Sequence, residues 1–298
     1  MNLMKSNPSA RGVFPYLHGY SKEIMRNWHL ISNPSCCTMQ LKEFMMFYGP
    51  NKKICNALFN KIEVVYNENH GVYGSPRIYQ VMRKLGLLCS QNRVARLMRI
   101  KGIRSKIKRK FKVTTHSAHR RPVAPNLIKH GFSASAPNRL WTSDITYIRT
   151  NQGWLYLAVF LDVWSRRIVG WAMSRSQSDR LITQAFRQAL GSRRPEAGLV
   201  VHSDRGSQYC SRSFKELLTS NRYLQSMTAT GNSYQNAITE SFFATLKTEL
   251  VFHEIYLSRS QARRSIFKYI EMFYNRKRIH SALGGISPEQ FEKSETFA

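Results

Sequence analysis

Three short runs of β-forming residues follow one another between positions 140 and 174 of the 298-residue chain. They read LWTSDITYIRT, WLYLAVFLDV and RRIVGWAMS, and the turn segments TNQG and WSR separate them. Runs rich in Val, Ile, Tyr, Phe and Trp that are joined by such short turns are typical of adjacent antiparallel strands. This part of the chain is therefore predicted to begin a sheet, and the segments that follow it must cover the faces of that sheet.

The segments that follow alternate between helical and strand patterns. GLVVHSD is predicted to form a short buried strand, SRSFKELLTS a helix that starts at a serine cap, and SYQNAITESFFATLKTELV a long amphipathic helix. Residues 178–190, which lie between the three strands and GLVVHSD, are predicted to form a helix whose inward face holds Leu181, Ile182, Ala185, Phe186 and Ala189. Three antiparallel strands, a helix, a further strand and further helices predict an α/β layer architecture.

The charge of the chain is strongly basic and unevenly distributed. It carries 46 Lys and Arg against 17 Asp and Glu, which gives a formal net charge of +29 and a pI of about 10.4. No acidic residue occurs between Glu68 and Asp144, a gap that holds 17 Lys and Arg. Such a chain repels itself unless it meets a polyanion. Nucleic acid is the predicted partner, with an anionic membrane surface as the alternative.

Several other classes of protein are disfavoured by the same sequence. The five cysteines include no CxxC pair, so their spacing suits neither a zinc site nor a disulfide framework. The longest uninterrupted apolar run, LYLAVFL, is far too short to cross a bilayer. The amino terminus has no charged-then-apolar signal pattern. We therefore expect a reduced cytoplasmic protein with no membrane partner.

Two short capped helices are predicted upstream of the sheet. YGSPRIYQVMRKLG offers Ser75 as the N-cap, Pro76 at the first helical position and Gly86 as the stop. CSQNRVARLMRIKG repeats the pattern, with Ser90 as the cap and Gly102 as the stop. Two such helices joined by a tight turn predict a helix-turn-helix. An ordinary helical hairpin remains the alternative.

Basic residues follow the second of these helices closely. The densest stretch is KGIRSKIKRKFK, and a segment rich in Pro, Ser and Ala comes after it. The residues predicted to contact DNA phosphates or the major groove lie in the second helix (Arg93, Arg96 and Arg99) and in the basic stretch after it (Lys108, Arg109 and Lys110). The predicted organisation is an unassigned segment at 1–51, a helix-turn-helix-like region at 52–105, a basic linker at 106–137, and a core with a carboxy-terminal helical extension at 138–298.

Three carboxylates of the predicted core could act together. Asp144 lies inside the first strand, Asp204 ends the fourth, and Glu240 lies in the long helix, with 35 residues between the last two. If the first and fourth strands are neighbours in the sheet, the two aspartates lie side by side, and the helix can place Glu240 next to them. Oxygen ligands without Cys or His favour Mg²⁺, with Mn²⁺ as a substitute. Two such ions serve phosphodiester chemistry. The alternative is a turn-forming aspartate and a solvated helical glutamate.

Four stretches also carry a family resemblance. WTSDITYI, GWLYLAVFLDVWSRRIVGWAM, HSDRGSQY and GNSYQNAITESFFATLKTE resemble the catalytic core of DDE transposases and retroviral-type integrases. More narrowly, they resemble the second-frame (OrfB) product of bacterial insertion sequences of the IS-three family. The carboxy-terminal YIEMFYNRKRIHSALGGISPEQFE and the upstream helix-turn-helix segment fit the same family. The resemblance covers residues 54–293 and is specific, because several long motifs recur in order.

The resemblance implies a fold and a reaction. The fold is a ribonuclease H-like integrase core, a mixed five-stranded sheet flanked by helices, preceded by a small all-helical helix-turn-helix region. The reaction is Mg²⁺-dependent cleavage at element ends followed by strand transfer, in which a DNA 3′-hydroxyl is the nucleophile. The family's Asp, Asp, 35 residues, Glu pattern falls on Asp144, Asp204 and Glu240, which are then the catalytic residues and the ligands of two metal ions.

Other expectations follow from the resemblance. Asn236, Glu240 and Lys247 share one face of a helix, and in such cores this helix lies along the DNA. Lys247 is then a phosphate or base contact, with a solvent-exposed lysine as the alternative, and Asn236 is a weaker candidate. His202 is expected to line the site as a strand residue. The partners implied are element-end and target DNA, further copies of the chain, and an upstream-frame transposase subunit or fusion, in the bacterial cytoplasm at the nucleoid.

Two other functions remain open at this stage. One is an accessory DNA-binding protein without turnover that modulates transposition. The other is a structure-selective nuclease on the same fold. All three functions predict salt-sensitive DNA binding, so binding alone does not separate them.

Overall fold

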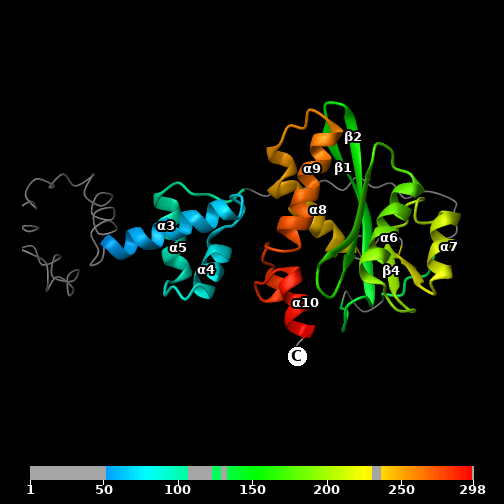
Figure 1. The fold of residues 1–298 in the computed structure, drawn as a ribbon, viewed down its shortest axis with the longest axis horizontal. Helices are drawn as coiled ribbons and strands as arrows, with labels where there is room; N and C mark the ends of the chain where they lie inside the picture. The colour runs from blue at the N-terminus through cyan, green and yellow to red at the C-terminus, as the bar shows by residue number, and fades with distance from the viewer. Residues whose placement is uncertain (1–51, 107–122, 129–132, 230–235, 297–298) are drawn as a thin grey trace, which may run out of the picture. The chain divides into compact units, whose positions relative to one another are not determined.

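The computed structural model describes residues 52–106, 123–128, 133–229 and 236–296 (Figure 1). The chain divides into two units, residues 1–61 and 62–298. The predicted DNA contacts Lys108, Arg109 and Lys110 lie outside the described residues. The predicted domain boundaries stay predictions.

A five-stranded mixed sheet forms the centre of the second unit, in the order β3-β2-β1-β4-β5. The three predicted runs pair antiparallel, and β4 pairs parallel with both β1 and β5. The strands are β1 (Leu140–Thr150), β2 (Gly153–Asp162), β3 (Ile168–Ser174), β4 (Val200–Ser203) and β5 (Leu224–Met227). The antiparallel strands and the α/β layers predicted from the sequence are therefore confirmed.

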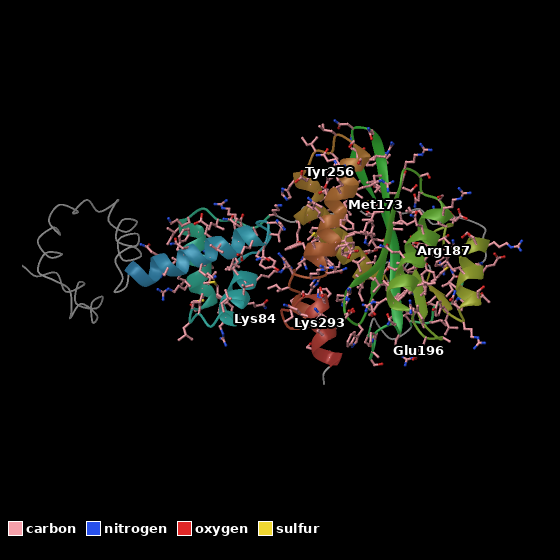
Figure 2. The ribbon with its side chains drawn as sticks, in the orientation of Figure 1. Lys84, Met173, Arg187, Glu196, Tyr256 and Lys293 are labelled. Carbon is pink, nitrogen blue, oxygen red and sulfur yellow. The ribbon has the colours of Figure 1, made fainter. Side chains whose placement is uncertain are left out.

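Helices cover both faces of this sheet. Figure 1 shows α6 (Asp179–Arg193) and α7 (Arg212–Ser220) beside one face, with α8 (Ala237–Glu249) and α9 (Arg259–Phe267) beside the other. The five apolar residues predicted for the inward face of α6 are all buried. The opposite face of α6 is polar, and Figure 2 labels its exposed Arg187. Burial of one apolar stripe against the sheet is what holds such a helix in place.

The contact between α6 and the sheet is unusually close at Gly170. A Cβ atom at this position would lie 2.4 Å from the carbonyl oxygen of Ala185 and 2.6 Å from the Cβ of Ala189. Real atoms do not approach that closely, so only glycine lets β3 and α6 meet here. The core between them includes the aromatic rings of Trp141, Phe160, Phe186 and Phe214.

The carboxy-terminal part of the chain is helical, as predicted. Its elements after α9 are the π-helix η5 (Lys268–Tyr274), the 3₁₀-helix η6 (Ser281–Leu283) and α10 (Pro288–Thr296), and a short 3₁₀-helix η4 (Val251–His253) precedes α9. No described helix has both the length and the apolar character needed to cross a bilayer.

In the part of the chain that the structure describes, the helices before the sheet are α3 (Lys52–Glu68), α4 (Ser75–Lys84) and α5 (Gln91–Ile100). The predicted cap of α5 is confirmed, because the Ser90 side chain accepts a hydrogen bond from the Arg93 amide. The predicted cap of α4 is wrong. Ser75 is already inside the helix, and Gly74 occupies the N-cap without a side-chain hydrogen bond. The fixed φ of Pro76 suits the first helical turn, so the helix can begin without a side-chain cap.

Candidate active site

Two adjacent parallel strands place Asp144 and Asp204 side by side. In the β1–β4 ladder Ser143 lies opposite Ser203, and each aspartate is the next residue of the chain, Asp144 within β1 and Asp204 directly after β4. The Ile145 amide donates to Asp144 Oδ1 at 2.7 Å, and the Gly206 amide donates to Asp204 Oδ1 at 2.9 Å. These backbone donors fix both carboxylates at one edge of the ladder, as the sequence predicted from neighbouring strands.

The three predicted carboxylates act on one another electrostatically. Burial, followed by the charge of Asp204, raises the pKa of Asp144 well above its usual value, and Glu240 adds to the shift. The Ile145 amide and the Lys247 ammonium oppose it. The pKa of Glu240 is raised by partial loss of hydration and by the charge of Asp204, although its side chain is exposed at the surface. Like charges held this close favour a bound cation.

The donor chemistry of this cluster fits a hard cation, since all three groups supply carboxylate oxygens. The structure does not show a complete coordination shell. Among the described residues, no three His, Cys, Asp or Glu side chains are arranged together as a set of metal ligands. The two aspartates on the strands are the fixed part of the cluster, and Glu240 approaches from a separate helix.

The first turn of α8 is anchored to β1 next to Asp144. The Thr239 hydroxyl donates to Thr142 Oγ1 at 2.8 Å, and Asn236 Nδ2 donates to the Ser143 carbonyl at 3.3 Å. These contacts position Glu240, the residue after Thr239. Asn236 is 3% exposed, and its Oδ1 is buried with no hydrogen-bond partner among the residues that the structure describes. Its predicted contact with DNA stays a prediction.

Lys247 lies on the side of α8 that faces β1. Its side chain is buried, and its ammonium nitrogen is 5.1 Å from the centre of the Tyr147 ring. Burial lowers the pKa of Lys247, and the charge of Asp144 works against that shift. The alternative of a solvent-exposed lysine is therefore wrong, because only 8% of Lys247 is exposed. Contact with DNA at this residue stays a prediction.

Sequence reasoning missed a buried tyrosine beneath the aspartates. The hydroxyls of Tyr209 and Ser143 lie 2.8 Å apart in a hydrogen bond. Burial raises the pKa of Tyr209 well above its usual value, and the charges of Asp144 and Asp204 add to the shift. Its position in HSDRGSQY gave no periodic signal of this role. His202 is a buried strand residue, as expected, with Nδ1 2.9 Å from the hydroxyl of Ser226.

The predicted DNA-contacting arginines of α5 lie around a helix with an apolar face. Val94 and Met98 are buried on that face. Arg96 and Arg99 are exposed, and Arg93 is half-buried. The exposed pair is therefore accessible to a phosphate backbone, and contact with DNA stays a prediction for all three.

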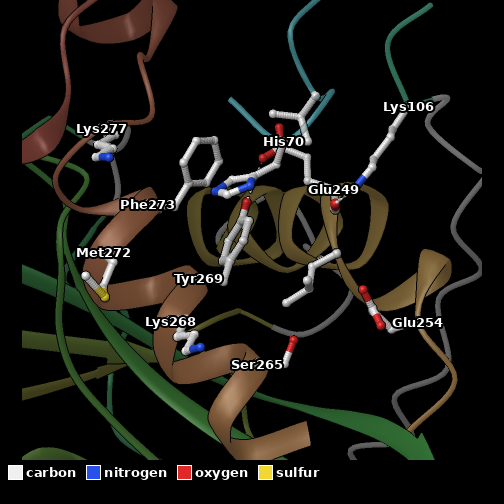
Figure 3. A pocket seen from close by; sticks show the side chains of 12 residues that line it. His70, Lys106, Glu249, Glu254, Ser265, Lys268, Tyr269, Met272, Phe273 and Lys277 are labelled. Carbon is white, nitrogen blue, oxygen red and sulfur yellow. Dashed lines mark hydrogen bonds between the residues drawn. The ribbon is translucent and has the colours of Figure 1, made fainter. Parts of the chain in front are cut away.

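A buried ion pair at the far end of α8 was also missed. Glu249 accepts hydrogen bonds from Arg278 Nη2 at 2.8 Å and from the Tyr269 hydroxyl at 2.7 Å, and Arg77 Nη1 lies 3.4 Å away. Figure 3 shows Glu249 and Tyr269 beside a cavity of about 450 Å³ that Lys106 also lines. The pair links α8 to residues far away in the sequence, which local patterns do not reveal.

Models of known protein families match both the helical region before the sheet and the core that contains the sheet. Two models described as an integrase core domain match residues 134–233 and 240–295. A model described as an HTH-like domain matches residues 53–111. Together with the mixed five-stranded sheet, these matches confirm the predicted ribonuclease H-like integrase fold preceded by a helical region.

One solved structure that the chain matches is the HTLV-2 integrase catalytic core domain in complex with magnesium. It is 18% identical, with a TM-score of 0.40, and the alignment covers 53% of this chain and 99% of the other.

Curated relatives are much more similar. The transposase InsF for insertion sequence IS3A of Escherichia coli is 45% identical over 220 residues, which cover 74% of this chain and 76% of the relative. The transposase for insertion sequence element IS904 of Lactococcus lactis is 44% identical over 237 residues, which cover 79% of this chain and 93% of the relative. Both alignments span most of each relative. The chain therefore belongs to the family of insertion-sequence transposases that includes InsF of IS3.

Proposed function

We propose that the chain is a DDE-type DNA transposase that cuts the ends of an insertion element and joins them to target DNA by transesterification. One observation carries this proposal. Asp144 within β1 and Asp204 directly after β4 each follow the last residue pair of one parallel ladder, and α8 is hydrogen-bonded to β1 where it brings Glu240 toward them. Membership in a transposase family supports the same reaction.

The carboxylates have a common role in this proposal. Asp144, Asp204 and Glu240 hold Mg²⁺, in two ions, and Mn²⁺ can substitute. Bound metal supplies activation of an attacking hydroxyl and stabilisation of the leaving oxygen of a phosphodiester. The protein supplies the fixed positions: backbone amides orient the two aspartates, and the Thr142–Thr239 hydrogen bond holds the helix that carries Glu240.

Basic residues place the DNA. Lys247 lies close enough to Asp144 to affect the pKa of that group, so it can neutralise a phosphate that binds beside the carboxylates. Arg96 and Arg99 are exposed on α5 and are proposed to contact the backbone of element-end DNA. The net charge of +29 favours such contacts along much of the chain. Assembly of several copies on DNA, together with an upstream-frame subunit, completes the proposal.

The test is strand joining on labelled element-end DNA with Mg²⁺. Wild type is compared with Glu240→Gln and with Glu216→Gln, which removes an exposed glutamate of α7. Each protein is assayed with and without the upstream-frame product. We expect joining by wild type and Glu216→Gln and none by Glu240→Gln. If no protein joins strands under any condition while all bind DNA, the transposase proposal fails and an accessory DNA-binding role remains.

A further inference from the structure

A second cavity, of about 250 Å³, lies on another side of α8. Its lining includes Arg77, Arg166, Ser241, Thr245, Arg278 and His280. Ser241 and Thr245 lie one and five positions beyond Glu240, which is roughly 100° and 140° around a helix of 3.6 residues per turn. The cavity is therefore turned away from the carboxylate cluster.

The cavity carries more positive charge than its carboxylates offset. Glu249 pairs with Arg278 at 2.8 Å and with Arg77 at 3.4 Å. Arg166, by contrast, has no carboxylate within ion-pair distance among the residues that the structure describes. The next residue, Arg167, pairs with Glu292 at 2.7 Å. Glu249 thus offsets two of the three guanidinium groups at the cavity, and Arg166 is the third.

The backbone holds Arg166 at the cavity wall. The Tyr274 hydroxyl donates to the Arg166 carbonyl at 3.2 Å, and the φ of Arg166 is +59°. Burial lowers the pKa of Arg166, which reflects a charge that has lost part of its hydration. A partly buried cation of this kind is costly unless an anion meets it. The arrangement therefore favours an anionic ligand.

The chemistry of the lining selects among anions. Guanidinium groups bind phosphate oxygens through paired N–H donors, and Ser241 and Thr245 add hydroxyl groups. An adjoining cavity of about 440 Å³ shares Arg77, Thr245 and Arg278 with this one and adds Lys106. Glu249 also lines the adjoining cavity. Several cations along two adjoining cavities suit a chain of phosphates better than a single small anion.

We propose that the cavity around Arg166 binds a backbone phosphate of DNA, on the side of α8 turned away from Glu240. The assignment rests on the proposed function in one respect, that DNA is the substrate. It adds a contact outside the carboxylate cluster, so the phosphate bound here belongs to a nucleotide other than the reacting one. This contact holds the DNA along both sides of the helix that carries Glu240.

The test measures binding of a fluorescent element-end duplex to the full chain without divalent metal, by anisotropy at several salt concentrations. Arg166→Gln is compared with wild type and with Arg187→Gln. This control also removes one arginine charge, from an exposed position on α6. We expect Arg166→Gln to weaken binding about tenfold and to reduce the salt slope by about 0.9. Arg187→Gln should bind as wild type does. Equal affinities and slopes for the two variants would overturn the proposal.

Two further variants test the same cavity. One separates the charge of Arg166 from its paired donors, and the other leaves Arg166 in place. Arg166→Lys keeps the charge and loses the paired donors, so its salt slope should match wild type while its affinity is intermediate. If Arg166→Gln does not fold, Ser241→Asp, on the exposed surface of α8, places a negative charge at the cavity instead. It should weaken binding similarly, and wild-type binding by this variant would overturn the proposal.

A free phosphate ion is the other source of the same chemistry. If inorganic phosphate raises the melting temperature of wild type but not of Arg166→Gln, while DNA affinity is unchanged by the substitution, the cavity takes phosphate and not DNA. Because binding is measured without metal, it is independent of strand joining. Loss of DNA affinity in Arg166→Gln together with no strand joining by wild type would support this site and refute only the proposed reaction.

Discussion

Substitution of Glu249 by glutamine should destabilise the protein strongly. The side chains of Glu249 and Arg278 are only 7% and 5% exposed, and three hydrogen bonds of 2.8 to 3.1 Å join them. Glutamine keeps the shape and removes the charge, so Arg278 stays buried without its counter-ion. Removing one partner of a buried ion pair costs about 3–5 kcal/mol of the free energy of unfolding. For a unit of this size that corresponds to a melting temperature lower by about 6–20 °C.

The assay is thermal and urea unfolding followed by circular dichroism. Glu216→Gln is the matched control, because Glu216 pairs with Arg212 on the exposed surface of α7, where solvent screens the pair and its loss should hardly change stability. The double variant Glu249→Gln, Arg278→Met should recover part of the loss, since it removes both buried charges. If Glu249→Gln costs no more than Glu216→Gln, the reasoning about this buried pair is refuted.

Three further predictions concern single positions. The pKa of Asp144 is raised in the folded protein, so Asp144 destabilises the fold increasingly as the pH rises above the pKa that this group has in the unfolded chain. Asp144→Asn should therefore raise the melting temperature of the metal-free protein at neutral pH. An unchanged melting temperature would contradict this prediction. Burial and the charges of Arg278, Arg77 and Arg166 lower the pKa of His280 to about 2. Only the unfolded chain then takes up this proton below about pH 6.5, so stability falls with falling pH by up to about 1.4 kcal/mol per unit; urea unfolding of His280→Asn should lack that component of the slope. Gly170→Ala should cost about 1–3 kcal/mol in the same assay because its Cβ meets α6, whereas Gly191→Ala, within α6 with open space around its Cβ, should stabilise by up to about 1 kcal/mol.

Long periodic segments were predictable from the sequence. The three antiparallel strands and the inward face of α6 follow from side-chain periodicity, and the meeting of Asp144 and Asp204 follows from one assumption about strand neighbours. The resemblance implied a fifth strand, but the side-chain pattern did not locate β5, because LQSM is four residues long and only its last two are buried. The predicted cap of α4 was wrong by one residue, because the helix already includes Ser75 and Gly74 is its N-cap.

The parts of the candidate site that escaped prediction depend on long-range contacts. Thr239 meets Thr142 across 97 positions, Tyr209 meets Ser143 across 66, and Glu249 meets Arg278 across 29. No periodicity relates such pairs, and only the assembled sheet brings them together. The electrostatic coupling of the carboxylates likewise arises from the fold, because Glu240 reaches the strands only through the anchored helix.

The central claim is that Asp144, Asp204 and Glu240 form one metal-binding cluster. Its most direct test is Mn²⁺ binding to the full chain, measured by electron paramagnetic resonance, for wild type and for Asp144→Asn, Asp204→Asn and Glu240→Gln. Asp179→Asn is the matched control, since Asp179 lies in the first turn of α6. We predict saturable Mn²⁺ binding by wild type and Asp179→Asn and a marked loss in each of the other three. Equal binding by all five proteins would contradict the account.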